Sequence, residues 1–382
     1  MNIICFSNID WGFIKQRHQH LMSAFAEMLE VENIIFVETL GTRSLMLNKE
    51  DLRRGIKKVV SRSKAKQHTD DEISEKIKIL SPKFLPLFND AAYEINSVLL
   101  KYQINKITRE HNIKLEDTIA WVMLPHPSIY RLLKKMKFNK IIFDCIDDIK
   151  SIPNTKEIII NTEENLIKES DIVFTTSNAL NRKCIQLNEN TYMLKNAVSK
   201  EFLNEKNRVN ADKKKKVVGY VGTIYEWFDL AIIEQLAKCN TDIDIILAGP
   251  VRIDVSTLME YNNVKLLGKV SYEEVEKLIE SFDVCLIPFI VNDLILNTNP
   301  VKLYEYFSKG KPVVTANIPE IREFENLLYA YDNSEEFLEA VRKALDEKDV
   351  NLFSKRKDVA SRNTWESRTE NALEIIKIKN NK

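Results

Sequence analysis

The sequence has little glycine, few cysteines and none of the signatures of common cofactor enzymes. Only 8 of its 382 residues are glycine, and none of them forms the Gly-x-Gly-x-x-Gly pattern of dinucleotide-binding enzymes, which argues against a dehydrogenase. The 5 cysteines are scattered and lack the short spacings of a metal site. We expect them to be small buried hydrophobic side chains of a protein in a reducing compartment. No other cluster has the spacing of metal ligands, so no metal ion is expected.

An excess of positive charge and long apolar runs are missing as well. Lysine plus arginine and aspartate plus glutamate number 56 each, so the net charge does not point to nucleic acid. The chain starts directly with the apolar stretch "IICFS", without the basic start and extended apolar segment of a signal peptide. No apolar run approaches the roughly 20 residues that span a bilayer. We therefore expect a cytoplasmic protein that does not bind nucleic acid.

Short β-branched runs alternate with helical patterns along the chain. Almost all of these runs are apolar without alternation, which is typical of parallel strands covered on both faces. Helical patterns lie between them, for example at 15–30 and 273–281. The pattern predicts an α/β fold with doubly wound parallel sheets. The expected strands form two series, at 3–7, 33–38, 118–124, 140–145 and 171–177, and at 216–222, 242–249, 263–268, 283–289 and 312–316.

A polar, charged stretch at 207–216 separates the two series of strands and is expected to link two domains. We predict a first Rossmann-like domain at 1–206, a second at 207–360, and a C-terminal helix at 361–382. That helix carries an apolar face and needs an apolar partner, so we expect it to return to the first domain. The residues on this face are Trp365, Ala372, Leu373 and Ile376.

The segment 53–66, "RRGIKKVVSRSKAK", is the most basic part of the chain. One interpretation is a solvated helix face or loop. The other is a surface that approaches the anionic headgroups of a membrane leaflet. The second interpretation would make the protein peripheral on the inner face of the cell membrane.

Ligands of open α/β sheets bind beyond the carboxyl ends of the strands, so the residues that follow strands are candidates for a site. After the first strand, Gly12 would allow close approach of the backbone, and Arg17 and His20 lie in the first turns of a helix; the alternative is a helix with exposed polar residues. His126 stands between two prolines and is expected to face the site, the alternative being a hydrogen-bonded loop histidine. Asp147 is either a catalytic base or a helix cap.

In the second half, Gly222 directly follows a strand, where exposed backbone N–H groups suit a phosphate. Further on, Pro300 is expected at or near the first position of a short helix that ends at Gly310. The free amides of its first turn, together with Lys302, would favour an anion such as a diphosphate. Glu305 could accept two hydrogen bonds from a vicinal diol such as a ribose. The alternative is an exposed Lys–Glu pair.

The order and spacing of these motifs resemble the GT-B glycosyltransferases. In particular, the chain is similar to the teichuronic-acid-type, capsule-associated branch of glycosyltransferase family 4. The resemblance implies two Rossmann-like domains that face a cleft, with a nucleotide sugar bound mainly by the second and an acceptor by the first. It also implies retention at the anomeric carbon without a metal ion. The segments that carry it are "QRHQHL", "IIFDCIDDI", "DIVFTTSNAL", "VVGYVGTIYEWFDL", "NVKLLGKVSYEEV", "IPFIVNDL", "NPVKLYEYFSKGKPVV" and "NTWESRTENALEI".

The resemblance assigns roles to individual residues. Glu305 matches the glutamate that holds the ribose, His126 the histidine near the donor sugar and its phosphate, and Gly222 the glycine beside the diphosphate. Asn297 stands where the family often has an earlier glutamate, and no cation follows Gly222, so Lys302 is expected to take part of that role. His126 and Lys302 are the catalytic candidates. The residues expected at the donor nucleotide are Gly222, Thr223, Gly249, Val270, Asn299, Pro300, Val301, Lys302 and Glu305. Those expected at the donor sugar or the acceptor are Trp11, Gly12, Arg17, His20, Asp147 and Asn297.

The sequence therefore predicts an enzyme that transfers a hexosyl residue from a nucleotide-diphosphate sugar, with a UDP-sugar favoured, to a lipid-linked cell-surface glycan, without a cofactor. Two alternatives stay open. A sugar-nucleotide epimerase on the same fold would form its product without any acceptor. A non-catalytic partner protein would keep the fold without turnover; Asn297 favours it, and the pair of Lys302 and Glu305 argues against it.

Overall fold

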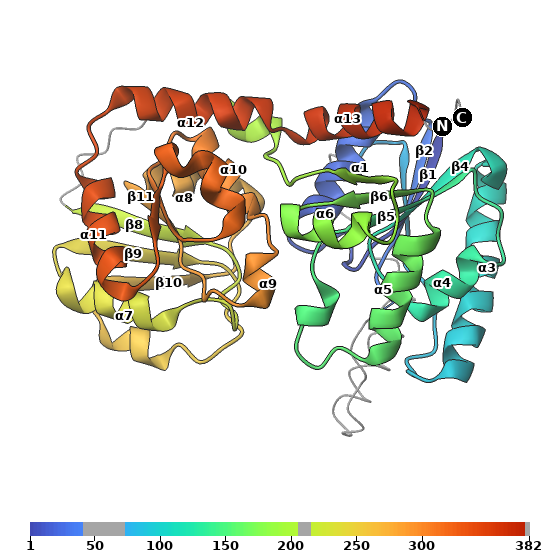
Figure 1. Cartoon of the computed structure of the whole chain (residues 1–382), viewed down its shortest axis with the longest axis horizontal. Helices are drawn as coiled ribbons and strands as arrows, with labels where there is room; N and C mark the ends of the chain where they lie inside the picture. Colours follow the sequence, from blue (N-terminus) through green and yellow to red (C-terminus); the bar gives the residue numbers. More distant parts are fainter. Residues whose placement is uncertain (41–72, 205–214, 379–382) are drawn as a thin grey trace. The chain divides into compact units, whose positions relative to one another are not determined.

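The computed structural model describes residues 1–40, 73–204 and 215–378, and it contains two parallel β-sheets (Figure 1). The basic segment 53–66 and nearly all of the predicted linker 207–216 lie outside the described residues. Within the described ranges, no helix is both long enough and apolar enough to cross a membrane.

The chain forms two compact units. The first unit consists of Met1–Leu194 together with Ala372–Lys382, and the second of Lys195–Asn371. The expected ranges differ from this division: the second unit begins twelve residues before 207, and it also takes the beginning of the C-terminal helix. The rest of that helix belongs to the first unit.

The sheet of the first unit has seven parallel strands in the order β3-β2-β1-β4-β5-β6-β7. Its central strands are apolar and buried over their whole length, as expected for strands with helices on both faces. The strands are β1 Asn2–Phe6, β2 Asn33–Val37, β3 Ile77–Leu80, β4 Thr118–Val122, β5 Lys140–Cys145, β6 Ile172–Thr175 and β7 Thr191–Met193.

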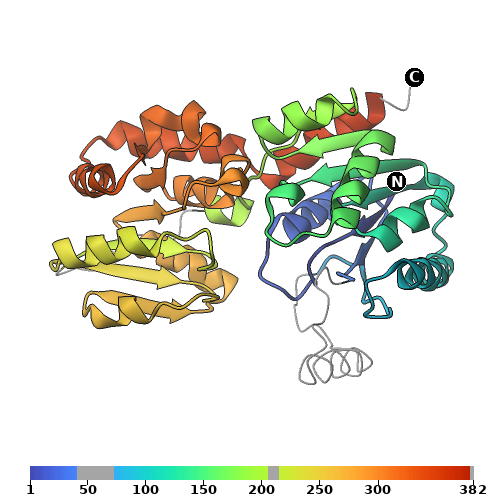
Figure 2. The ribbon, with the colours of Figure 1, turned by 60° about the horizontal axis from the view of Figure 1, so that its bottom comes forward.

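Helices cover both faces of this sheet (Figure 2). Side chains cap several of them: Asn89 accepts a hydrogen bond from the N–H of Ala92 at the start of α3, and Ser177 accepts one from the N–H of Leu180 at the start of α6. The helices are α1 Arg17–Glu27, α3 Asp90–Glu110, α4 Pro127–Leu133, α5 Glu157–Glu169 and α6 Asn178–Ile185, with 3₁₀ turns at Leu115–Asp117 and Ile149–Ser151.

The second unit repeats this plan with six parallel strands in the order β10-β9-β8-β11-β12-β13. The prediction of two doubly wound parallel sheets is therefore confirmed. The strands are β8 Lys216–Val221, β9 Ile243–Ala248, β10 Val264–Gly268, β11 Val284–Ile287, β12 Val313–Ala316 and β13 Tyr329–Tyr331.

The helices of the second unit follow the local signals in the sequence. Ser271 caps α8 and forms a capping box with Glu274, whose carboxylate accepts a hydrogen bond from the backbone N–H of Ser271 at 2.8 Å. The helices are α7 Leu230–Cys239, α8 Tyr272–Ser281, α9 Asp293–Leu296, α10 Val301–Ser308, α11 Ser334–Leu345 and α12 Val350–Arg362, with 3₁₀ turns at Lys200–Leu203, Ser256–Glu260 and Pro319–Leu327.

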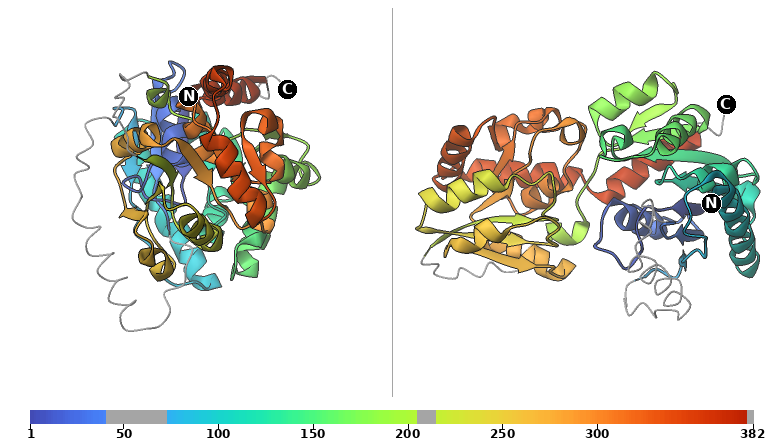
Figure 3. Two further views of the ribbon diagram at one scale, coloured as in Figure 1. Left: turned by 90° about the vertical axis from the view of Figure 1, so that its left-hand side faces the viewer. Right: turned by 90° about the horizontal axis from the view of Figure 1, so that it is seen from below.

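The last helix, α13 Trp365–Ile378, passes from the second unit into the first. Its C-terminal half lies beside the beginning of the chain (Figure 3), where Nζ of Lys377 donates to the carboxylate of Glu30 at 2.9 Å. Its predicted apolar face is buried, since none of the four side chains is more than 5% exposed. These side chains are Trp365, Ala372, Leu373 and Ile376.

The strand order locates the sites that this fold offers. In each sheet the chain starts in the middle, builds outward to one side, and then crosses to the other side. The order reverses between β1 and β4 in the first unit, and between β8 and β11 in the second. Loops on either side of such a reversal diverge and leave room for a ligand at the carboxyl edge of the sheet.

Candidate functional site

The helix α10 begins and ends where the sequence signals place it. Pro300 is its N-cap, one position before the first helical residue, so the N–H that proline lacks is not needed. Gly310 ends the helix with a φ of +64°. The N–H of Gly310 donates to the carbonyl of Phe307 at 2.9 Å, and the N–H of Lys311 to that of Tyr306 at 3.1 Å. These two bonds form a Schellman motif, which favours glycine at this position.

Lys302 and Glu305 lie one turn apart on α10 and form an ion pair, with Nζ of Lys302 at 2.8 Å from Oε2 of Glu305. The Glu305 side chain is only 6% exposed and that of Lys302 26%, so this is not the exposed surface pair of the alternative interpretation. The pKa of Tyr272 is raised, mainly by burial of its hydroxyl group and next by the negative charge of Glu305. The pair thus supplies a cation and a buried acceptor at the beginning of α10.

Gly222 and Gly249 bring two strand ends into backbone contact near this helix. The N–H of Gly222 donates to the carbonyl of Ala248 at 2.9 Å, and a Cβ on Gly249 would lie 1.9 Å from the carbonyl oxygen of Gly222. The helix α10 is tied to the same strand end, because Oη of Tyr306 accepts a hydrogen bond from the N–H of Val221 at 3.0 Å. Gly222, Gly249 and α10 therefore gather at the carboxyl edge of one sheet.

Three other predicted donor residues are half-buried at this edge of the second unit. Thr223 follows Gly222, and its carbonyl accepts a hydrogen bond from Oη of Tyr220 at 3.1 Å. Val270 packs against the apolar core of the unit. Asn297 is the C-cap residue of α9, three residues before the N-cap of α10.

Asn299 is buried and its polar groups are used inside the protein. It is 2% exposed, its Oδ1 accepts a hydrogen bond from the backbone N–H of Asn196, and its Nδ2 donates to Oη of Tyr304. Its amide is therefore not presented to a ligand. This corrects the expectation that Asn299 contacts the donor directly.

Arg17 is also buried, in an ion pair with Asp144. Nε and Nη2 of Arg17 donate to the two carboxylate oxygens of Asp144 at 3.1 and 2.8 Å, and Nε1 of Trp121 donates to the same carboxylate at 3.2 Å. Neither member of the pair is more than 3% exposed. The interpretation of Arg17 as part of an exposed polar helix face is thus wrong, because this guanidinium ties α1 to β5. Its contact with a ligand stays a prediction.

Trp11 and His20 are buried as well, whereas Gly12 lies exposed in a turn. The Trp11 ring packs edge-to-face against Phe36 with 4.9 Å between ring centroids, and its backbone N–H donates to Glu38 at 2.9 Å. The ring of Trp11 is thus a part of the core packing, and its contact with the donor sugar or the acceptor stays a prediction. Of Trp11, Gly12, Arg17 and His20, only Gly12 is exposed.

His126 follows β4 and is the N-cap of α4. Its Nδ1 accepts a hydrogen bond from the backbone N–H of Ser128 at 3.1 Å, and its ring packs edge-to-face against Tyr93. Burial lowers the pKa of His126 to about 4, so the ring is neutral at pH 7. Because Nδ1 accepts, the proton of the neutral ring is on Nε2, which can donate a hydrogen bond.

Asp147 lies beyond the end of β5. Burial raises the pKa of its carboxyl group, the charge of Asp148 adds to this shift, and Arg17 opposes it. Asp148 has its own partners, Nζ of Lys183 at 2.9 Å and the hydroxyl of Ser151 at 2.6 Å. Of the two aspartates, Asp147 is thus the one whose carboxyl pKa is raised, whereas the pKa of Asp148 is lowered.

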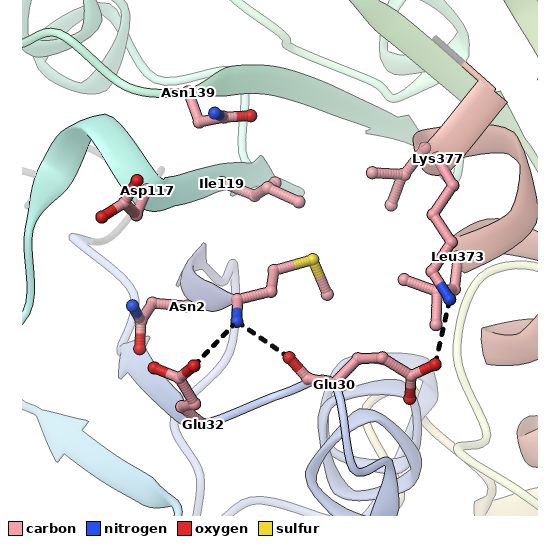
Figure 4. A pocket seen from close by; sticks show the side chains of 10 residues that line it. Asn2, Glu30, Glu32, Asp117, Ile119, Asn139, Leu373 and Lys377 are labelled. Atoms are coloured by element: carbon pink, nitrogen blue, oxygen red, sulfur yellow. Dashed lines mark hydrogen bonds and ion pairs between the residues drawn. The ribbon is translucent and has the colours of Figure 1, made fainter. Parts of the chain in front are cut away.

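Two features of the structure were not anticipated. In α1, His18 is 3% exposed, and within the described part of the chain neither of its ring nitrogens has a hydrogen-bond partner. At the amino edge of the first sheet there is a hollow of about 400 Å³ (Figure 4). It lies at the opposite end of the strands from the predicted site residues, and its lining includes Asn2, Glu30, Asp117, Asn139 and Lys377.

Metal-binding groups do not gather in the residues at 1–40, 73–204 and 215–378: no three His, Cys, Asp or Glu side chains there could hold an ion together. The sequence contains one Asp-x-Asp triplet, from Asp242 to Asp244. It lies at the beginning of β9, at the edge of the sheet opposite the candidate site, and Nζ of Lys265 is 2.9 Å from the carboxylate of Asp244.

Comparison with known proteins shows a match to one family model within the second unit. Residues 215–347 match the family model described as glycosyl transferases group 1. Over 278 residues the chain is 23% identical to TuaH of Bacillus subtilis strain 168, which its name assigns to teichuronic acid biosynthesis as a glycosyltransferase; the match covers 65% of this chain and 69% of TuaH.

Solved structures with the same fold span the whole chain. Sucrose-phosphate synthase from Thermosynechococcus elongatus is similar with a TM-score of 0.71 and 11% identity, covering 98% of each chain. HepE of Anabaena, solved in complex with UDP, has a TM-score of 0.68 and 14% identity, and the match covers 98% of this chain and 99% of HepE. The fold is that of the GT-B glycosyltransferases.

Proposed function

We propose that this GT-B glycosyltransferase, with its group 1 glycosyl transferase domain at 215–347, transfers a hexosyl residue from a UDP-sugar to a lipid-linked glycan of the cell surface. The observation that carries the proposal is the ion pair at the start of α10. A buried carboxylate, a partly exposed cation and the first turn of a helix occur together at the carboxyl edge of a doubly wound sheet.

The two members of that pair serve different parts of the donor. The Nζ of Lys302 and the amides of the first helical turn attract the diphosphate and stabilise the charge that develops on it as the sugar leaves. Glu305 accepts hydrogen bonds from the two ribose hydroxyls. Gly222 and Gly249 let the backbone approach the diphosphate, since neither presents a side chain. Catalysis then depends on positioning and on charge stabilisation.

His126 has the properties of a hydrogen-bond donor to the donor sugar or its phosphate. It is neutral at pH 7 and carries its proton on Nε2, as its contact with Ser128 requires. Its proposed role is to orient the donor without adding charge. Asp147, with its raised pKa, is proposed to contact the acceptor or the donor sugar. The reaction is proposed to retain the anomeric configuration and to need neither a metal ion nor a cofactor.

The relatives support the choice of donor and acceptor. The HepE structure contains UDP, and the name of TuaH refers to teichuronic acid, a cell-wall polymer. The acceptor is proposed to be linked to a lipid and to lie at the inner leaflet of the membrane. The basic segment 53–66 is proposed to bind the anionic headgroups there.

The described surface of the first unit offers a second contact for the same leaflet. The outer face of α3 is apolar over about two turns. Lys106, which is ion-paired with Glu110, and Arg109 continue it with basic side chains that complement anionic lipid. The acidic side chains at its edge, Asp90 and Glu94, are ion-paired with Arg131. The apolar residues, 38–71% exposed, are Ile95, Val98, Leu99 and Tyr102.

A transfer assay tests the proposal. The purified protein is incubated with membranes from the producing cell and a panel of radiolabelled UDP-, GDP- and dTDP-hexoses, and lipid-extractable label is measured. Transfer from a UDP-hexose, dependent on the membranes, is the expected result. Conversion of the nucleotide sugar without any acceptor would indicate an epimerase, and neither transfer nor conversion with any donor would contradict the proposal.

A further inference from the structure

Asn196 and Asn299 hold each other through reciprocal hydrogen bonds. The backbone N–H of Asn196 donates to Oδ1 of Asn299 at 3.0 Å, and Nδ2 of Asn196 donates to the carbonyl oxygen of Asn299 at 2.7 Å. Both residues are buried. A third bond, from Nδ2 of Asn299 to Oη of Tyr304 at 3.3 Å, extends the network onto α10. The side-chain amide and the carbonyl of Asn299 are thus all engaged.

These bonds lie at the point where the chain enters α10. Asn299 directly precedes the N-cap Pro300, and Tyr304 is one turn into the helix. The network therefore holds the entry turn from both sides, by the segment at Asn196 and by the helix itself. The attraction of a helix for an anion is confined to its first turn, so the orientation of this turn decides where a diphosphate is held.

The segment at Asn196 is in turn held by α13. Nε of Arg368 donates to the carbonyl of Lys195 at 3.0 Å, and Nη2 of Arg368 donates to the carbonyl of Asn196 at 3.3 Å. Lys195 is the first residue of the second unit, and Arg368 lies three residues before its end. The network thus connects both ends of this unit's chain with the entry to α10.

We infer that Asn196 and Asn299 are positioning residues for the donor diphosphate. They do not touch the ligand. They fix the first turn of α10 so that its backbone amides and Lys302 are directed toward the same diphosphate. The inference rests on the proposed function and deepens it, because it names residues that hold the diphosphate end of the same site. It also explains how Asn299 can affect donor binding although its buried side chain does not contact the ligand.

Binding measurements with three probes test the inference. UDP, inorganic pyrophosphate and uridine are titrated calorimetrically into the wild-type protein and into Asn196→Ala, Asn299→Ala and the double variant. We expect UDP and pyrophosphate to bind about tenfold more weakly to Asn299→Ala, a change of about 1.4 kcal/mol, and uridine to bind within about twofold of wild type. In the double variant the fold-loss of UDP affinity should be smaller than the product of the fold-losses in the two single variants, because the two residues act through one contact.

Asn317→Ala is the matched control, since its amide donates to the surface carboxylate of Asp332 and not to a residue of α10. It should bind all three probes like the wild type. Should Asn299→Ala not fold, Tyr304→Phe removes one hydroxyl acceptor from the same network and serves the same comparison.

Three results would overturn the inference: unchanged UDP affinity in the variants, equal losses for UDP and uridine, or strictly additive losses in the double variant. Equal losses would show that the asparagines only maintain the fold. A wild-type protein that binds neither UDP nor pyrophosphate would instead contradict the proposed function, so the two failures are distinguishable.

Discussion

Gly249 and Gly222 are in direct backbone contact, so closely that a Cβ on Gly249 would lie 1.9 Å from the carbonyl oxygen of Gly222. Gly249 also has a φ of +139°, a conformation that L-amino acids with a side chain rarely adopt. The ends of β8 and β9 can approach each other in this way only because Gly249 lacks a side chain, whereas a Cβ on Gly222 would meet the side chain of Tyr220. This close approach leaves backbone, rather than side chains, at the proposed diphosphate position.

Gly249→Ala should therefore destabilise the protein by about 1–3 kcal/mol or more, because the obstacle is backbone that cannot rotate away. Urea unfolding measures this free energy. Gly268→Ala is the control: Gly268 has a φ of +67°, but no atom lies within 4 Å of a Cβ there, so only the conformational strain of about 1–2 kcal/mol remains. Equal effects of the two substitutions would show that the contact with Gly222 is unimportant.

Glu305→Ala should weaken UDP binding by roughly 1.5–3 kcal/mol, because the ribose hydroxyls lose a charged acceptor. Isothermal titration of the folded variant measures the change. Glu339→Ala removes a carboxylate from a comparable but exposed pair, in which Nζ of Lys343 is 2.8 Å from Glu339, and should bind UDP normally. Unchanged UDP affinity in Glu305→Ala would show that Glu305 only forms an ion pair with Lys302 and does not bind the ribose.

Turnover should survive exhaustive treatment with EDTA. In the proposed mechanism the positive charge that stabilises the leaving diphosphate comes from Lys302 and from the first-turn amides of α10. The transfer assay is repeated after dialysis against the chelator, with and without added magnesium or manganese. Complete loss of activity that either ion restores would refute the metal-independent mechanism.

The stability of the fold should fall in mild acid because of His18. Burial lowers the pKa of His18 to about 3, and the charge of Arg17 adds to the effect. An unfolded histidine titrates near pH 6.5, so the unfolded state binds the proton more tightly than the folded state. The stability linked to this group is fully present above that pH and is lost as the pH falls toward the folded pKa.

Between pH 8 and pH 5 the loss linked to His18 should amount to about 2 kcal/mol. Urea unfolding at the two pH values measures it, and His18→Leu should remove this part of the pH dependence. His111→Leu replaces an exposed histidine and serves as the control. A pH dependence in His18→Leu as steep as that of the wild type would show that His18 is not the responsible group.

The protein should sediment with anionic vesicles at low salt. Each basic residue near such a surface contributes roughly 1 kcal/mol, so reversing four charges of the basic segment should abolish binding and leave donor hydrolysis intact. The candidates for reversal are Arg53, Arg54, Lys57, Lys58, Arg62, Lys64 and Lys66.

The α3 face is tested separately with Val98→Asp and Tyr102→Asp, which place negative charge on its exposed apolar residues. Both should weaken sedimentation with anionic vesicles. Met259→Asp is the control, because Met259 is an apolar side chain 71% exposed in the second unit. If the wild type does not sediment at low salt, the basic segment is merely solvated and the α3 face has another partner or none.

The sequence predicted the central strands better than the edge strands. Both sheets were expected, and the ten runs in the two series correspond to β1, β2, β4–β6 and β8–β12. The strands β3, β7 and β13 were missed. Each has three or four residues and a neighbour on one side only, so it needs fewer apolar residues and leaves a weaker pattern.

The site residues show the same limit. The helix α10 could be predicted because its signals, Pro300 and Gly310, act within one or two turns of chain. The burial of Arg17 against Asp144 could not, because 127 residues separate the two partners and each looks like an ordinary surface residue in its own segment. The contact between Asn196 and Asn299 could not be predicted either, since the two residues are 103 positions apart in the sequence.

The division of the chain into units has a consequence for its synthesis. The second unit is one continuous stretch, Lys195–Asn371, whereas the first is completed only by Ala372 and the residues after it. On the ribosome the first sheet therefore emerges long before the C-terminal half of α13, whose Leu373 and Ile376 line the hollow at the amino edge of that sheet. The first unit must remain without these side chains, its amino edge open to chaperones or to other nascent chains, until Ala372 and the residues after it have been made.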